Sequence, residues 1–396
     1  MAFLFMNKSY NAHMSIDNTI SDIHTNYNME RDSNIELLRI ISMFMIVFNH
    51  LSGHGVMHRL SETPYVIWAQ GSFFNKIFSS FLGSGGEVGV AIFFIITGYF
   101  YCSKNHGRIM KVCLQTLFYS LLTVIAFVIS KIFGANYPSI STISLIKNFA
   151  QNIFNPVSGG GYWFVTVYVA VILLIPLVNP FLRKLSKRGF VLFLFFAWFF
   201  WYFLAAEWSV FFQLQKGLFF YAFGAFIQLH LKKDEIGKWR YVLLFWIAWI
   251  LGTALQYEIA LLGSAVDLSG KQKVMAEIFS LLETGVVVPL CAVSLFRLFE
   301  SLHIRRSKII NIIASTTFGV YLLHDSVVGR NLLWYEIFKV DTVLYRSALF
   351  PLMAVCIVAI IFGVSSLIDY LRGKLIEPIM IDKCYLCVEK IMDLFF

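Results

Sequence analysis

Long apolar runs make up most of the chain and are separated by short clusters of charged residues, Gly, Pro and Asn. Most runs approach the roughly 20 residues that an α-helix needs to cross about 30 Å of hydrocarbon. The apolar residues are continuous rather than alternating, which argues against a transmembrane β-barrel. The pattern predicts an all-α, polytopic membrane bundle of about ten transmembrane helices. They are placed near residues 37–57, 88–103, 112–133, 162–182, 189–205, 210–231, 241–262, 274–296, 309–329 and 348–371.

The composition agrees with this pattern. Of the 396 residues, 58% are hydrophobic and only 14% are charged. Soluble globular domains are nearer 45–50% apolar and about 25% charged. Disordered chains carry still fewer apolar residues. Both classes are therefore excluded, and a lipid bilayer is the expected surrounding of the chain.

The positive charge is explained by topology. The chain carries 32 Lys and Arg against 23 Asp and Glu, a formal net charge of +9. Roughly two thirds of these cations fall in the segments that share a side with the N-terminus, as the rule for short cytoplasmic loops requires. Both termini are therefore predicted to be cytoplasmic, in a multi-pass protein of the cell membrane, the bacterial cytoplasmic membrane. Nucleic-acid binding is not needed to explain the charge.

The polarity of successive segments divides the chain into three predicted parts. Residues 1–33 are polar and predict a disordered cytoplasmic leader, without an apolar stretch long enough for a signal peptide. Residues 34–372 form the predicted transmembrane domain. Residues 373–396 are the predicted cytoplasmic tail.

Two ionisable residues interrupt the first predicted span. Arg39 and His50 are eleven residues apart, which is close to three helical turns, so they share one face about 16 Å apart along the axis. Charged groups inside a span are costly and mark candidate sites. One face with a cation at the inner end and an imidazole towards the outer end predicts the wall of a polar passage. A snorkelling Arg39 and a merely hydrogen-bonded His50 are the alternative readings.

Several motifs then follow in order along the chain. They are the Arg39-x10-His50 pattern, GGEVGVAIFFIITGY at 85–99, GYWFVTVY at 161–168 with IPLVNP at 175–180, and FGVYLLHD at 318–325. This order and spacing resembles the acyltransferase-3 family of integral membrane acyltransferases, which modify cell-surface glycans. The resemblance covers about residues 35–371. It implies an enzyme that transfers an acyl group, usually from cytoplasmic acetyl-CoA, to a sugar hydroxyl at the outer face.

The chain departs from the family pattern at two positions. Ala91 stands where many members have a carboxylate, with Glu87 nearby as a partial substitute. Glu36 stands where Asp is common and keeps the charge, so it is a candidate supporting residue. Some members of the family carry a hydrolase-like domain after the last span, which is not seen in this sequence, so the transfer is expected to proceed without a fused second enzyme.

The resemblance assigns roles to the Arg39 and His50 stripe and to the basic loop after the second span. Lys104, Arg108 and Lys111 are expected to contact the phosphates of coenzyme A, with Arg39 just inside the mouth. Because all inner loops are basic, orientation alone also explains these loop cations. His50 is expected to be the general base for direct transfer, since a neutral imidazole is available near pH 7. A covalent acyl-histidine intermediate is the alternative route.

Five further residues are candidates for binding substrate or supporting the site. His324 and Asp325 lie on the same side of the membrane as His50 and suit orientation of its ring or acceptor binding, although a helix cap explains them too. Glu283 lies deep in the eighth predicted span, where it requires a cavity or a basic partner. Tyr162 and Trp163 begin the fourth span, where sugar stacking competes with an ordinary aromatic belt.

A metal site and a transporter are the remaining alternatives. His54 and His58 continue an i, i+4 series from His50, the spacing that can hold zinc. No Cys or acid nearby in the sequence completes such a site, so no metal is predicted. Polar residues within spans also suit a transporter or flippase of a glycan or small anionic solute, which needs no acyl donor. Membrane-bound O-acyltransferases of the other large class carry their histidine late in the chain, unlike His50.

Overall fold

The computed structural model describes residues 32–58, 63–104, 109–134, 162–204, 210–233, 237–265 and 269–378, with isolated positions 147 and 150. Throughout this described part, every regular element is helical. The structure therefore confirms the predicted all-α class. The predicted leader lies outside the described residues except for Asp32 and Ser33, as does most of the predicted tail.

Seven helices are long and apolar enough to cross a membrane. Five of these spans consist of α2 (Ser33–His50) with the π-helical turn Leu51–Val56, α4 (Phe73–Gly83) with α5 (Gly85–Tyr101), α6 (Ile109–Ile132), α8 (Trp163–Lys184) and α11 (Lys238–Gly263). The other two are the run from α12 (Gly270–Leu282) through the π-helical turn Glu283–Val287 to α13 (Val288–Ser301), and α17 (Phe350–Leu375).

An eighth candidate span is broken. It comprises α14 (Lys308–Ser315), α15 (Thr317–His324) and, after a 75° bend, α16 (Val327–Asn331) with the π-helical turn Leu332–Ile337. The short α3 (Val66–Ala69) and the π-helical turn Val340–Leu344 lie outside these candidate spans. The break lies within the ninth predicted span, 309–329.

The predicted count of ten spans is not confirmed at the fifth and sixth. These segments form α9 (Lys187–Phe199), a π-helical turn Phe200–Leu204 and α10 (Val210–His230), which are not among the candidate spans. Helix α10 carries polar residues within its apolar run, and two of them, Gln213 and Lys216, are buried inside the protein. Length and composition alone define the seven to eight spans, so the orientation of the termini stays a prediction.

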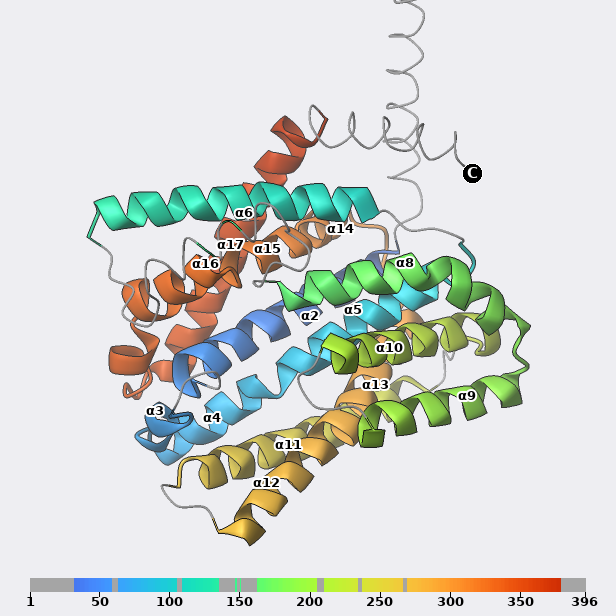
Figure 1. The fold of residues 1–396 in the computed structure, drawn as a ribbon, viewed down its shortest axis with the longest axis horizontal. Coiled ribbons are helices and arrows are strands. Elements are labelled where there is room, and N and C mark those ends of the chain that lie inside the picture. Colours follow the sequence, from blue (N-terminus) through green and yellow to red (C-terminus); the bar gives the residue numbers. More distant parts are fainter. Residues whose placement is uncertain are drawn as a thin grey trace, which may run out of the picture.

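Helix α5 lies at the centre of the bundle between α2 and α10. In Figure 1, α2 and α5 run side by side through the middle, with α6 along one edge and α11 and α12 at the opposite edge. Glycines allow this close packing. A Cβ at Gly98 of α5 would collide with the backbone of Tyr221, and a Cβ at Gly224 of α10 would collide with the backbone of Ile95. Small residues at such contacts let helix backbones approach in a membrane protein.

The contact between α5 and α10 yields a test of the packing. Gly98→Ala forces the two backbones apart, and overpacking of this kind costs about 1–3 kcal/mol. The expected result is a lower thermal unfolding midpoint of the purified protein in detergent.

Gly363→Ala in α17 is the matched control, because a Cβ added there would meet no other atom within 4 Å. At this position alanine should leave the midpoint unchanged or raise it, since glycine weakens a helix by up to about 1 kcal/mol. Equal midpoints for Gly98→Ala and the wild type would show that the two helices do not pack as described.

Candidate active site

His50 is the last residue of α2, where the helix widens into a π-helical turn. The N–H of Met57 donates to the carbonyl of Ser52 at 2.7 Å, a bond between residues five apart. In this wider turn His50 and His54 stay on nearly the same face, with ring centroids 5.1 Å apart. The Tyr335 hydroxyl donates to the His54 carbonyl at 2.8 Å and so satisfies a backbone group of the widened turn.

Helix α15 places His324 and Asp325 beside His50, directly before the break that leads into α16. His324 ends α15, and Ser326 caps α16 by accepting a hydrogen bond from the Gly329 N–H at 2.9 Å. His324 and Asp325 are buried, with exposed fractions of 0% and 1%. The structure therefore joins two predicted residues to His50, from which they are separated by more than 270 positions in the sequence.

The hydrogen bonds of His324 define the proton positions on both rings. Its Nδ1 lies 2.6 Å from the Val320 carbonyl, and since a carbonyl only accepts, Nδ1 is the donor. In the neutral imidazole Nε2 is then the acceptor. It lies 2.9 Å from His50 Nδ1, which must donate to it. These assignments follow from the hydrogen-bond partners, and they leave the lone pair of His50 on Nε2.

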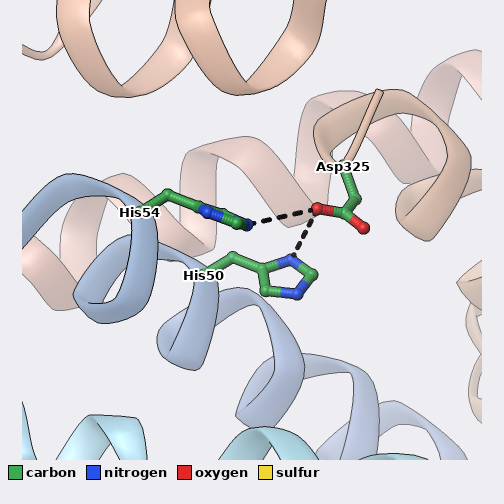
Figure 2. Close-up of side chains that lie close together, drawn as sticks. All are labelled: His50, His54 and Asp325. Atoms are coloured by element: carbon green, nitrogen blue, oxygen red, sulfur yellow. Dashed lines mark ion pairs between the residues drawn. The ribbon is translucent and has the colours of Figure 1, made fainter. Parts of the chain in front are cut away.

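Asp325 provides the negative charge of the site (Figure 2). Its Oδ1 lies 3.4 Å from His50 Nδ1 and 3.5 Å from His54 Nε2. Arg330 Nε donates to the same oxygen at 2.7 Å. A buried carboxylate needs such a partner to stay ionised. Asp325 can therefore stabilise a positive charge that develops on the His50 ring.

A cavity of about 730 Å³ begins at His50 and follows α2. The residues that α2 and its cap contribute to the lining are Asp32, Glu36, Arg39, Met43, Ile46 and His50. Their spacing alternates between three and four, so they form one stripe about 27 Å long at 1.5 Å per residue. The prediction that Arg39 and His50 share one face along a polar passage is confirmed in its geometry.

The end of the cavity near His50 is aromatic. Trp163, Phe164 and Tyr168 of α8 and Tyr321 of α15 line it. The Phe164 ring lies 5.7 Å from that of Tyr168 and 5.6 Å from that of Tyr321, measured between centroids. The Tyr321 ring in turn lies 6.4 Å from the His324 ring. These rings offer flat apolar faces close to the imidazole.

The other end of the cavity, where α2 begins and α17 ends, is charged. Arg39, Lys104 and Lys111 of the predicted donor site line it, as do the unpredicted Arg372 and Lys374. Arg39 lies 3.9 Å from Glu36, and about a third of its side chain is exposed. Carboxylates complete the lining, and those among the described residues are Asp32, Glu36, Asp369 and Glu377. Arg108 lies outside the described residues.

Two predicted residues contribute to packing or lie elsewhere. Tyr162 is buried, and its hydroxyl donates to the Leu322 carbonyl at 2.9 Å, which fixes α8 against α15. Only its neighbour Trp163 reaches the cavity. Glu283 hydrogen-bonds with Gln256 of α11 and is not part of the cavity lining.

Glu87, the carboxylate predicted to substitute in part for the one missing at Ala91, also has a partner. Glu87 accepts from Lys216 of α10 at 2.6 Å, and Lys216 is buried. The Lys216 ammonium lies 5.2 Å from the Trp163 ring. The Glu87 and Lys216 pair therefore packs against Trp163 at the aromatic end of the cavity.

An acid does complete the histidine series, although none lies nearby in the sequence. Asp325 lies with His50 and His54 so that one ligand atom of each falls within 4.8 Å of the others. His50 Nδ1 is, however, engaged by His324, and Asp325 Oδ1 is engaged by Arg330. A cation bound there would also lie close to the Arg330 guanidinium. His50 Nδ1 and Asp325 Oδ1 are thus engaged within the protein, which disfavours a metal bound through these two atoms.

Fold and site together define a multi-pass helical membrane protein with a hydrogen-bonded, oriented histidine at one end of an internal cavity. The model of the acyltransferase domain of the acyltransferase-3 family matches residues 32–370. The chain belongs to this family and is a membrane acyltransferase. No curated protein and no solved structure gives a significant match to the chain.

Arg330 and Arg372 belong to the site but were not predicted from sequence. Arg372 follows Asp369 by three residues in an apolar run. Opposite charges at this spacing on a membrane helix indicate a buried ion pair, so this residue had a usable signal. Arg330 is separated from Asp325 by a helix break, and helical periodicity gives no signal across a break.

His324 is expected to act on the reaction through His50. His324→Ala removes the acceptor for His50 Nδ1–H, so the His50 ring is no longer held in one orientation. Loss of an orienting partner of this kind lowers activity by about 10- to 100-fold. Acyl transfer by membrane vesicles should lose kcat by this factor, with KM for the donor unchanged.

His324→Gln provides the conservative comparison, because its amide oxygen can accept the same hydrogen bond. It should recover part of the lost kcat. Wild-type kcat in His324→Ala, at the same protein level in the membrane, would contradict the orienting role.

Proposed function

We propose that the protein is an O-acetyltransferase that transfers an acyl group from cytoplasmic acyl-CoA to a hydroxyl of a cell-surface polysaccharide or its precursor. The observation that carries the proposal is one cavity with two different ends. His50 lies at the aromatic end, and Arg39, Lys104 and Lys111 lie at the charged end. A donor that carries phosphates at one end and a thioester at the other matches this arrangement.

The chemical step requires a base for the acceptor hydroxyl. His50 Nε2 takes the hydroxyl proton while the hydroxyl oxygen attacks the thioester carbonyl carbon. The C–S bond then breaks, and the leaving thiolate takes the proton back from the imidazolium. Asp325 stabilises the imidazolium between these two events, in the same way that a buried carboxylate supports the histidine of other acyl-transfer sites.

Two features support the assignment of the two ends. Coenzyme A is polyanionic, and arginine and lysine are the side chains that bind phosphates. The charged end would face the cytoplasm in the orientation predicted from the loop cations. Sugar rings present apolar faces that suit Trp163, Phe164 and Tyr168, so the acceptor is proposed to enter at the aromatic end.

Membership of an acyltransferase family favours this function over the transporter or flippase that the sequence left open. Direct transfer also needs a single free nitrogen at His50, and the hydrogen bond to His324 leaves Nε2 free. A covalent acyl-histidine on Nε2 would need the same nitrogen. It predicts labelled protein when acetyl-CoA is supplied without acceptor, whereas direct transfer predicts none.

The acetyl content of surface polysaccharide tests the function. NMR of the polysaccharide should show O-acetyl groups in cells with the wild-type gene and none in cells without it. His50→Ala should reduce the initial rate of acetylation by about 10²- to 10⁴-fold, the usual contribution of a general base.

His303→Ala is the control, because His303 is exposed in the connection between α13 and α14. It should acetylate as the wild type does. Radiolabelled acetyl-CoA supplied to inverted vesicles should label the glycan. Equal acetylation by wild type and His50→Ala at equal membrane levels would refute the role of His50, and label in the vesicle lumen without labelled glycan would indicate transport.

A further inference from the structure

The charged end of the cavity contains a carboxylate between two cations. Glu377 pairs with Lys111 of α6 through one oxygen, and its other oxygen lies 3.0 Å from Arg372 Nη1 of α17. All three residues line the cavity. Burial raises the pKa of Glu377, but Lys111 and Arg372 lower it more, so the pKa lies below its ordinary value. Glu377 is therefore an anion at neutral pH.

Arg372 does not depend on Glu377 for its position. Its Nε donates to Asp369 at 2.8 Å, and its exposed fraction is 5%. Asp369 is held in turn by the hydroxyl of Tyr119 at 2.5 Å and by the amide of Gln115 at 3.1 Å. One edge of the guanidinium is thus fixed by the protein, and Nη1 lies 3.0 Å from a carboxylate oxygen of Glu377.

Glu377 does not contribute to the Arg372 and Asp369 pair. Helix α17 ends at Leu375, and Glu377 follows two residues later. The pair of Arg372 and Asp369 lies wholly within α17, so withdrawal of the Glu377 carboxylate would leave it intact.

The charges also favour replacement of this carboxylate by a stronger anion. Among the described residues, five cationic and four anionic side chains line the cavity. Without Glu377, the described lining of the cavity carries an excess of two positive charges, and Lys111 and Arg372 are among its cations. A phosphate carries more charge than a carboxylate and has more acceptor oxygens for an arginine fork and an ammonium.

We propose that Lys111 and Arg372 form a phosphate site for the donor, and that Glu377 occupies it as an internal competitor until the donor displaces it. The inference rests on the proposed function, which supplies acyl-CoA as the donor. It adds Arg372 to the residues that bind the donor. Glu377, in contrast, weakens donor binding because its carboxylate competes with the phosphate.

Equilibrium binding of free coenzyme A to the purified full-length protein in lipid nanodiscs tests this inference. Glu377→Gln keeps the shape of the side chain and removes its charge, so it should bind coenzyme A about tenfold more tightly than the wild type. S-acetylpantetheine, which lacks all phosphates of the nucleotide part, should bind both proteins equally. In the Lys111→Met background, Glu377→Gln should gain clearly less than tenfold.

Glu336→Gln is the matched control. Glu336 lies in the π-helical turn after α16, away from the cavity lining, and should leave coenzyme A affinity unchanged. For every variant the fraction of folded protein is measured by size-exclusion chromatography, and the binding curves are normalised to it.

The outcomes separate the two levels of the proposal. Coenzyme A binding by the wild type with equal or weaker binding by Glu377→Gln would overturn the competitor while the acyltransferase function stands. Absence of both coenzyme A binding and glycan labelling in the wild type would overturn the proposed donor and this inference with it. A tenfold gain shared by S-acetylpantetheine would also overturn it, since the effect would not depend on phosphate.

Discussion

A hydrogen bond between His50 Nδ1 and His324 Nε2 joins the first described helix to the end of α15. His324 is fully buried and must satisfy its polar atoms within the protein, whereas His50 is partly exposed and lines the cavity. His324 donates to Val320 and is left with one acceptor, and His50 must then point its remaining lone pair away from His324. One packing constraint thus orients the base.

The rest of the site depends on the bend that follows the residues of this hydrogen bond. The N–H of Asp325 still donates to the Tyr321 carbonyl, so α15 places the Asp325 carboxylate beside both His50 and His54, and the 75° bend comes after it. Arg330, one turn into α16, then neutralises that carboxylate. The widened turn after His50 and the bend after His324 are both departures from regular α-helix, and they face each other. Local irregularity of this kind is common at functional sites.

Sequence periodicity predicted what lies on one helix and missed what depends on contacts between helices. The stripe from Arg39 to His50 follows from helical geometry alone, and the order of motifs indicated the family. The placement of Arg330 beside Asp325 required the bend, which no periodicity reveals. The two spans near 189–205 and 210–231 were placed by hydropathy, but Lys216 in α10 is buried by pairing with Glu87. Glu377 lies in the predicted tail, yet it returns to contact Lys111 on α6.

The central claim is that His50 presents an unprotonated Nε2 to the cavity because His324 holds the proton on Nδ1. Nitrogen-15 NMR of protein labelled at histidine, with the His50 signals assigned by their loss in His50→Gln, measures this directly. At neutral pH the account predicts a neutral His50 ring with Nδ1 protonated and Nε2 unprotonated. A ring protonated on Nε2 would contradict it, because the lone pair would then face His324 and no base would face the cavity.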